Sequence, residues 1–413
     1  MKRIAQVNSV CDRGSTGIIA KHICQASIEN GYDSKIFFGY GESGYDNSQR
    51  LSSDLYIKFN ILKTRLFGKH AFYSKFATRK LVRLLKQYQP DLIHIHQIHG
   101  HYLNIPIFFK FLMDYDLDVV ITMHDCWMFT GHCAHFDFYG CDKWKTGCYE
   151  CPQLNEYPVS WFFDRSKQNY ADKKKYFNMI DKLHLITPSQ WLCDFLPDSF
   201  LAKHERNVIN NGIDINDFKK RDTTELKKKL GLEDEFIIVG MASKWLRNVH
   251  KQKTLDFIEK LDDDIIVILI GYADNPDDLP SNVIPIPFVN GRKELSEYYS
   301  LGDVFINLTL EDNFPTVNLE SLSCGTPIIT FDSGGSGEAI DENTGFNVAK
   351  GDFDAILDAV NKIKTSNRDY SDMCRARAVS KYDKDKCYQQ YVDFFASILE
   401  GKYDESNDGF KFL

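Results

Sequence analysis

The chain has 413 residues, of which 43% are hydrophobic and 26% charged, and its formal net charge is −8 at pH 7. This composition is typical of a folded protein of two or three domains, and it excludes a disordered chain, a fibre and a small disulfide-rich scaffold. Residues 1–199 hold 24 basic and 20 acidic side chains, whereas residues 200–413 hold 26 and 38. The acidic balance of the whole chain argues against a nucleic-acid partner.

Three further features bear on the compartment of the protein. No stretch approaches the roughly 18 uninterrupted apolar residues of a membrane-spanning helix, and the first residues lack the apolar segment of a signal peptide. Eleven cysteines are an odd number, so they cannot all pair within one chain. We therefore expect a cytoplasmic protein.

Short apolar runs alternate with helical periods through the first half of the chain. We expect a helix at residues 18–28 and strands at residues 4–10, 35–40, 92–95, 119–123 and 183–187. Runs this short and apolar are typical of strands that are buried on both faces. The alternation predicts a doubly wound parallel sheet.

The pattern restarts after a turn cluster at residues 210–214. Strands are expected at residues 236–241, 265–270, 283–286, 304–308 and 327–331, and helices at residues 252–260, 295–300 and 315–323. The sequence thus predicts an α/β protein with two Rossmann-like domains, residues 1–205 and 206–380, facing each other across a cleft. Residues 381–413 are expected to form a last helix at 386–399 and a loosely held polar tail.

The segment from Glu311 to Glu320 is the most informative motif. Asp312 falls in the loop that leads into the predicted helix, Pro315 suits the first turn of that helix, and Glu320 lies inside it. Taken alone, the two carboxylates favour a purely structural interpretation, an acidic loop followed by a glutamate on the helix surface. A helix N-terminus, however, offers free N–H groups and a positive dipole to an anion.

With the following Cys-Gly-Thr-Pro segment at residues 324–327, this motif resembles the nucleotide-sugar site of retaining glycosyltransferases of family 4, which have the GT-B fold. The family usually has two glutamates separated by seven residues. Here Asp312 occupies the first position and Glu311 precedes it, as in a sub-branch of polysaccharide-assembly enzymes. The resemblance implies that Glu320 binds the ribose hydroxyls and that one of the two acidic residues faces the sugar; which one stays open.

Other segments resemble the same family in the same order. The resemblance implies that the backbone from Asn313 through Phe314 and Pro315 to Thr316 faces the donor, that Gly17 lies where the first helix approaches it, and that His124 contacts the transferred sugar. Residues 187–191 and 211–214 resemble the interdomain segment, and residues 332–338 resemble a glycine-rich turn beyond the donor site.

The family's basic pair is altered here. An arginine and a lysine usually follow the first strand of the second domain and neutralise the leaving diphosphate. We place these roles at Arg247 and Lys253, although their spacing is unusual and a solvated basic turn is the alternative. A cation is needed because the nucleoside diphosphate leaves with developing negative charge.

The resemblance implies a glycosyltransferase that moves a sugar from a nucleoside-diphosphate donor to a hydroxyl of a glycan or lipid-linked glycan in surface polysaccharide assembly. It implies retention of configuration and no metal or other cofactor in the chemistry. The alternatives are a GT-B sugar-nucleotide epimerase or phosphorylase, and a non-catalytic subunit that binds sugar nucleotides.

A cysteine cluster interrupts the first domain as an insert at residues 126–152. Four of its thiols follow the spacing Cys-x7-Cys-x6-Cys-x2-Cys, which fits a structural zinc site: Cys133, Cys141, Cys148 and Cys151. Unliganded core cysteines or one or two disulfides are the alternatives. Seven of the twelve histidines lie between residues 94 and 135, but the later ligands that a catalytic metal would need are not evident.

Residues 58–86 hold nine Lys or Arg side chains and no acid, interleaved with apolar residues. Basic amphipathic helices of this kind bind anionic membrane surfaces. We expect peripheral association with the cytoplasmic membrane face; a solvated helix pair packed on the first sheet is the alternative.

Overall fold

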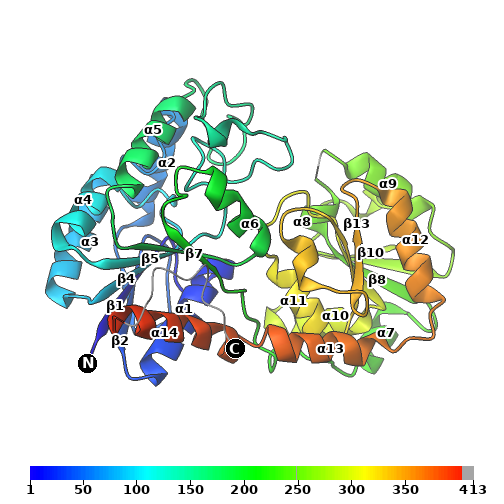
Figure 1. The fold of residues 1–413 in the computed structure, drawn as a ribbon. Coiled ribbons are helices and arrows are strands. Elements are labelled where there is room, and N and C mark those ends of the chain that lie inside the picture. Colours follow the sequence, from blue (N-terminus) through cyan, green and yellow to red (C-terminus); the bar gives the residue numbers. More distant parts are fainter. Residues whose placement is uncertain (248, 402–413) are drawn as a thin grey trace. The chain divides into compact units, whose positions relative to one another are not determined.

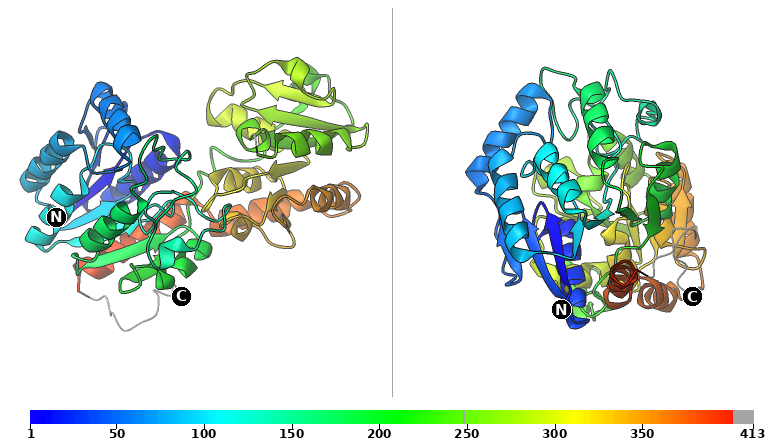
Figure 2. Two further views of the ribbon diagram at one scale, coloured as in Figure 1. Left: turned by 90° about the horizontal axis from the view of Figure 1, so that it is seen from above. Right: turned by 60° about the vertical axis from the view of Figure 1, so that its left-hand side comes forward.

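The computed structural model describes residues 1–247 and 249–401, which form two compact units. The first unit comprises Met1–Asn210 together with residues 387–401, and the second comprises Asn211–Lys386. Each unit is a parallel sheet with helices on both faces (Figures 1 and 2). The α/β class expected from the alternating pattern is confirmed.

The sheet of the first unit has the order β3-β2-β1-β4-β5-β6-β7 and is parallel throughout the described chain. Its strands are β1 (Arg3–Asn8), β2 (Asp33–Phe38), β3 (Ser48–Arg50), β4 (Leu92–Ile95), β5 (Asp118–Thr122), β6 (Leu183–Thr187) and β7 (Glu205–Val208). Its helices are α1 (Gly14–Glu29), α2 (Asp54–Phe67), α3 (Lys75–Tyr88), α4 (Ile105–Tyr115), α5 (Ser166–Phe177), α6 (Gln190–Phe195) and α14 (Lys384–Leu399).

Alternating side chains of these strands fill two cores. On one face, Ile4 and Leu92 pack with Ile23 of α1 and with aromatic residues of α14, including Tyr391 and Phe395. On the other face, the strands pack against α2 to α6. Burying apolar side chains on both faces is what makes the inner strands of this sheet largely apolar, whereas the edge strands β3 and β7 are polar.

The sheet of the second unit has the order β10-β9-β8-β11-β12-β13. Its strands are β8 (Phe236–Met241), β9 (Ile265–Ile270), β10 (Val283–Ile286), β11 (Val304–Asn307), β12 (Ile328–Phe331) and β13 (Gly345–Val348). Its helices are α7 (Thr224–Leu230), α8 (Ala242–Trp245), α9 (Lys251–Glu259), α10 (Gly291–Leu301), α11 (Thr316–Ser323), α12 (Phe353–Lys364) and α13 (Tyr370–Lys381).

The division of the chain differs from the expected one in two respects. The first unit extends to Asn210 rather than to residue 205, because β7 pairs with β6 and completes the first sheet. The last helix, α14, returns to the first unit, where Tyr388 packs against His22 of α1 and Gln389 hydrogen-bonds Asn30 (Figure 1). The predicted polar tail beyond residue 401 lies outside the described residues.

Candidate functional site

The strand orders place a reversal point in each sheet. In the first unit the chain continues to one side of β1 with β2 and later to the other side with β4; β8, β9 and β11 repeat this in the second unit. Ligands of doubly wound sheets bind beyond the carboxyl ends of the strands at such points. The segments that follow β1, β4, β5, β8 and β11 are therefore the candidate site residues.

The start of α11 lies beyond β11 and has no side-chain cap. Pro315 immediately precedes the helix as its N-cap residue, and its side chain makes no cap hydrogen bond. Phe314 is buried against Tyr382, and its carbonyl accepts a hydrogen bond from the Asn211 amide at 3.1 Å. The loop is thereby fixed while the first-turn N–H groups are left without a side-chain cap, as anion binding requires.

A buried amide and hydroxyl network holds α11 against the sheet. The Asn307 amide donates to Asn318 at 2.8 Å, and the Asn318 amide donates to the carbonyl of Ser336 at 3.0 Å. The Ser336 hydroxyl in turn lies 2.7 Å from the hydroxyl of Thr330. Satisfied buried networks of this kind fix one arrangement of the elements they join.

The glycine-rich turn predicted at residues 332–338 packs directly on the acidic loop. The Gly335 N–H donates to the carbonyl of Asp312 at 3.1 Å. Gly334 has φ +61°, and a Cβ there would lie 1.8 Å from the same carbonyl oxygen. A side chain at Gly334 would therefore displace the loop that carries Asp312.

Glu320 lies on α11 and is partly buried. Its carboxylate accepts a hydrogen bond from the Tyr299 hydroxyl at 2.9 Å. Burial raises the pKa of Glu320 to about 7, although the hydrogen bond from Tyr299 and the charge of Arg292 act in the opposite direction. The group is therefore about half ionised at neutral pH, and its ionised form only accepts hydrogen bonds.

The acidic loop pairs with a lysine that the sequence analysis did not select. Lys244 Nζ lies 3.3 Å from Asp312 Oδ2 and 3.2 Å from the hydroxyl of Thr309. Lys244 belongs to α8, which packs on β8 because Trp245 donates to the Ile306 carbonyl and occupies the space beside Gly240. The hydroxyl of Thr309 also donates to the carbonyl of Glu311 at 3.1 Å.

The two cations predicted from the sequence, Arg247 and Lys253, follow α8 in the chain. Lys253 is exposed in the first turn of α9 and lines a surface cavity with Asp256, Asp352 and Asp354. Arg247 is partly buried in the connection between α8 and α9. Among the described residues, Lys244 is thus the basic side chain that contacts Asp312, and the roles given to Lys253 and Arg247 stay predictions.

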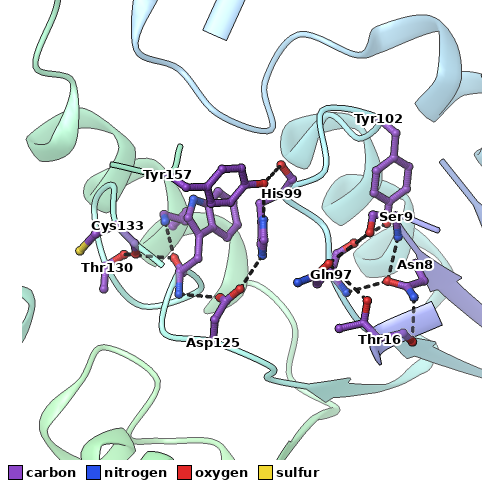
Figure 3. Close-up of polar contacts among 12 residues, drawn as sticks. Asn8, Ser9, Thr16, Gln97, His99, Tyr102, Asp125, Thr130, Cys133 and Tyr157 are labelled. Atoms are coloured by element: carbon purple, nitrogen blue, oxygen red, sulfur yellow. Dashed lines mark hydrogen bonds and ion pairs between the residues drawn. The ribbon is translucent and has the colours of Figure 1, made fainter. Parts of the chain in front are cut away.

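In the first unit, a polar network joins the turn after β1 to the end of β4 (Figure 3). The Asn8 amide donates to the carbonyl of Thr16 at 3.1 Å, and the Asn8 side-chain oxygen accepts from the N–H of Gln97 at 3.3 Å. The start of α1 is close to this turn, because a Cβ added to Gly17 would contact Val10 and the N–H of Asp12. The turn is therefore close-packed, and the approach to the donor that the family resemblance gives to Gly17 stays a prediction.

His124 follows β5 and is the accessible member of a histidine pair. Its Nε2 lies 3.0 Å from Nδ1 of His96, whose Nε2 lies 3.0 Å from Oε1 of Gln6. Gln6 and His96 are fully buried, whereas His124 is partly exposed. Burial lowers the pKa of His124 to about 4, so the ring is neutral at physiological pH.

Comparison with known proteins identifies the family of the chain. Residues 17–217 match the family model described as Glycosyltransferase Family 4, and residues 222–380 match the model described as Glycosyl transferases group 1. The chain belongs to the group 1, family 4 glycosyltransferases.

Relatives support this membership along the whole glycosyltransferase chain. A putative colanic acid biosynthesis glycosyl transferase of Escherichia coli K12, WcaC, is 26% identical over 421 residues, which cover 96% of this chain and 100% of the relative. The N-acetyl-alpha-D-glucosaminyl L-malate synthase of Bacillus anthracis is 24% identical over 48% of this chain and 56% of its own.

Solved structures share the GT-B fold with this glycosyltransferase. Sucrose-phosphate synthase from Thermosynechococcus elongatus has a TM-score of 0.68 at 15% identity, over 97% of this chain and 100% of its own. HepE from Anabaena, solved in complex with UDP, has a TM-score of 0.67 at 15% identity, over 96% of this chain and 100% of its own.

The cysteine insert of the glycosyltransferase brings its four predicted ligands to one small pocket. Cys133, Cys141, Cys148 and Cys151 all line it, and all are free thiols. Within residues 1–247 and 249–401, no group of three or more His, Cys, Asp or Glu side chains is placed to hold a metal ion. The thiols are therefore neighbours in this structure without forming a metal site.

Proposed function

We propose that this glycosyltransferase moves a sugar from a nucleoside-diphosphate donor to a hydroxyl of a glycan or lipid-linked glycan, during assembly of a surface polysaccharide. The observation that carries the proposal is the combination of Glu320 and the uncapped start of α11 at the reversal point of the second sheet. Relatives named for colanic acid, lipopolysaccharide core and O-antigen biosynthesis support the product class.

The donor site is proposed to bind the nucleotide through α11. Glu320 accepts hydrogen bonds from the two ribose hydroxyls, and the backbone from Asn313 to Thr316 faces the phosphates and the sugar. The complex of HepE with UDP, a protein of the same fold, supports a nucleoside diphosphate as the ligand. The contacts that the family resemblance gives to Gly17 and His124 stay proposals.

Charge development at the leaving diphosphate needs a cation, which we assign first to Lys244. Its contact with Asp312 ties the lysine to the loop that carries the acidic pair. Asp312 or Glu311 is proposed to orient the sugar hydroxyls, with Arg247 and Lys253 as further candidates for the basic pair. We propose that transfer retains the configuration of the sugar and uses no metal.

Screening nucleoside diphosphates tests the proposal. Melting temperatures are measured with UDP, GDP, ADP and TDP at millimolar concentration, and hydrolysis and transfer are then measured with the matching sugar nucleotides. At least one diphosphate is expected to raise the melting temperature. If none does, the assignment of the donor site is wrong.

The same screen separates the alternatives. An epimerase would convert the sugar nucleotide without an acceptor, and a phosphorylase would need bound pyridoxal phosphate. A non-catalytic subunit would bind the diphosphate and release no sugar. Loss of transfer in Glu320→Ala with the fold intact would count against that last alternative.

A membrane surface is proposed as a further partner. The basic segment predicted at residues 58–86 forms α2 and α3, and their exposed side chains include Phe59 and Phe76 beside lysines such as Lys63. No described helix is long and apolar enough to cross a bilayer. Cosedimentation with vesicles should therefore require anionic lipid and weaken with salt.

The cysteine pocket carries a narrower proposal, that its four thiols hold a structural zinc ion. Support comes from the collection of all four side chains around one small pocket. Because they are not placed as metal ligands in this structure, binding would have to draw the sulfur atoms together. Metal analysis of protein purified without chelator is expected to find one zinc per chain; no zinc together with four reactive thiols would overturn the proposal.

A further inference from the structure

Tyr157 has an unusual environment for a half-exposed aromatic residue. Its side chain is 47% exposed, yet its hydroxyl lies 2.9 Å from Nδ1 of His99, and His99 Nε2 lies 2.8 Å from Asp125 Oδ2 (Figure 3). His99 and Asp125 are only 3% and 8% exposed. A buried polar pair thus holds an exposed ring by its hydroxyl.

The donors and acceptors of this chain can be assigned from Asp125. Its other carboxylate oxygen accepts the N–H of Trp127 at 2.9 Å. Burial alone would raise the pKa of Asp125, but the neighbouring His99 and the hydrogen bonds outweigh burial and hold it at about 2. The carboxylate only accepts, so His99 Nε2 donates to it, and the Tyr157 hydroxyl lies beside His99 Nδ1 and 3.4 Å from the His99 carbonyl oxygen. The hydroxyl points inward, and the part of Tyr157 left to solvent is its ring.

Two imidazoles fix the orientation of that ring. His70 meets it edge to face at 5.6 Å between centroids and 88° between planes, and His99 does so at 5.6 Å and 63°. His70 is buried, which lowers the pKa of its ring well below the usual value and keeps it neutral. The orientation of Tyr157 is therefore set before any ligand arrives.

The ring also lies at the edge of the sheet where ligands are expected. His99 belongs to the segment that follows β4, and Asp125 directly follows His124 beyond β5. Tyr157 lies in the chain segment that follows the cysteine-rich insert, far from both in sequence. This segment therefore adds an aromatic side chain to the carboxyl edge of the first sheet.

We propose that the exposed face of Tyr157 is a stacking platform for a sugar ring of the acceptor glycan, with His99 and Asp125 as its positioning residues. The inference rests on the proposed function, because it names where the acceptor binds. The faces of a pyranose present C–H groups that suit the negative face of an aromatic ring, and a fixed tyrosine loses little conformational freedom on binding. Neither the hydroxyl nor the imidazole takes part in proton transfer to the acceptor.

Saturation-transfer NMR with millimolar lactose, cellobiose or methyl α-mannoside tests the platform. The wild-type protein is expected to transfer saturation to the C–H protons of at least one of these saccharides. Tyr157→Ala should weaken binding roughly threefold to tenfold, whereas Tyr157→Phe, which keeps the ring, should stay within about twofold of wild type. Tyr139→Ala is the matched control, since Tyr139 belongs to the nearby cysteine-rich insert and is 44% exposed.

Several outcomes would overturn the inference. They are a wild-type protein that binds none of the saccharides, an equal loss in Tyr157→Phe and Tyr157→Ala, and an equal loss in the Tyr139 control. Asp125→Asn should also reduce saccharide binding. If Asp125 only stabilised the fold of this segment, saccharide binding would not change. If Tyr157→Ala does not fold, Tyr157→Leu carries the same expectation.

Nucleoside diphosphate binding, measured on the same samples, separates this inference from the proposed function. All variants are expected to bind the diphosphate as the wild type does, because Glu320 and α11 are unchanged. Diphosphate binding without any saccharide binding would overturn the platform and leave the donor site standing. Loss of diphosphate binding in the wild type would overturn the proposed function itself.

Discussion

The two units share one strand order but differ in the chemistry at their carboxyl edges. The first sheet has imidazoles there, including His96, His99 and His124, whereas the second has the carboxylates of Asp312 and Glu320 with Lys244. The shared topology determines where a ligand binds, and the residues that follow each strand determine which ligand it is.

Burial shifts the pKa values of the histidines in the first unit and of Glu320 in the second unit in opposite directions. It lowers the pKa of His94 to about 3 and of His101 to about 4, because the charged form of an imidazole is disfavoured away from water. The same effect raises the pKa of Glu320 to about 7. The first unit therefore resists protonation in its folded state, while the second holds a proton more tightly than an unfolded chain would.

The largest predicted effect is that the first unit unfolds before the second when the pH is lowered. The buried histidines bind protons when unfolded but not when folded, so the free energy of unfolding falls as pH drops below about 6.5. Each should cost about 1 kcal/mol at pH 5.5, and seven have lowered pKa values in this unit: His70, His94, His96, His101, His124, His132 and His204. Hydrogen exchange across this pH range should show β4 and β5 losing protection before β8.

His70→Phe sharpens this test, because neither ring nitrogen of His70 has a hydrogen-bond partner among the described residues. Between pH 7 and pH 5.5, the free energy of unfolding of the variant should fall by about 1 kcal/mol less than that of the wild type, because one buried histidine has been removed. Earlier loss of protection in β8 would show that the buried imidazoles do not govern acid stability.

The next effect concerns the carboxylate of the second unit. Glu320→Ala removes a partner that accepts two ribose hydrogen bonds, so nucleoside diphosphate affinity should fall roughly a hundredfold. Isothermal calorimetry with the diphosphate found by thermal screening measures it. Glu259→Ala, an exposed glutamate of α9, is the control and should bind normally. Unchanged affinity in Glu320→Ala would place the nucleotide elsewhere.

The fold was predictable from the sequence to a large extent, because apolar runs reveal strands that are buried on both faces. Every predicted strand is present, whereas three short polar ones were missed: β3 (Ser48–Arg50), β7 (Glu205–Val208) and β13 (Gly345–Val348). These lie at or near sheet edges, where partial exposure removes the apolar signal.

The site was predictable only where a motif is continuous in sequence. Glu320 and the loop before α11 are of this kind. Lys244 was missed because its contact with Asp312 spans 68 residues, and Tyr157 because its partners follow strands far from the insert. Contacts between residues so far apart in sequence leave no periodicity or spacing in the sequence. The order of the strands in the folded sheet brings these residues together.

A smaller effect tests which cation serves the second unit. Lys244→Met should weaken diphosphate binding roughly tenfold, since it removes one charge-assisted contact beside the acidic loop. Lys253→Met should change it less than about twofold if the exposed position of that lysine keeps it from the ligand. The reverse ranking would return the leaving-group role to Lys253 and remove Lys244 from the site.

The smallest predicted effect is a pH dependence of donor affinity that comes from Glu320 alone. The carboxyl group has a pKa of about 7, so it is largely protonated near pH 6 and largely ionised near pH 8. Only the ionised form accepts from both ribose hydroxyls, so diphosphate affinity should rise roughly threefold to tenfold over this range. Buffer-corrected calorimetry at both pH values measures this rise, and Glu320→Gln, which does not titrate, should flatten it.

The Glu320→Gln variant should also be more stable than wild type at pH 8, because the folded state no longer holds an ionised carboxylate in a partly buried position. A pH dependence that persists in Glu320→Gln would instead belong to the nucleotide phosphates, and the contrast between the two sheet edges would then not extend to donor binding.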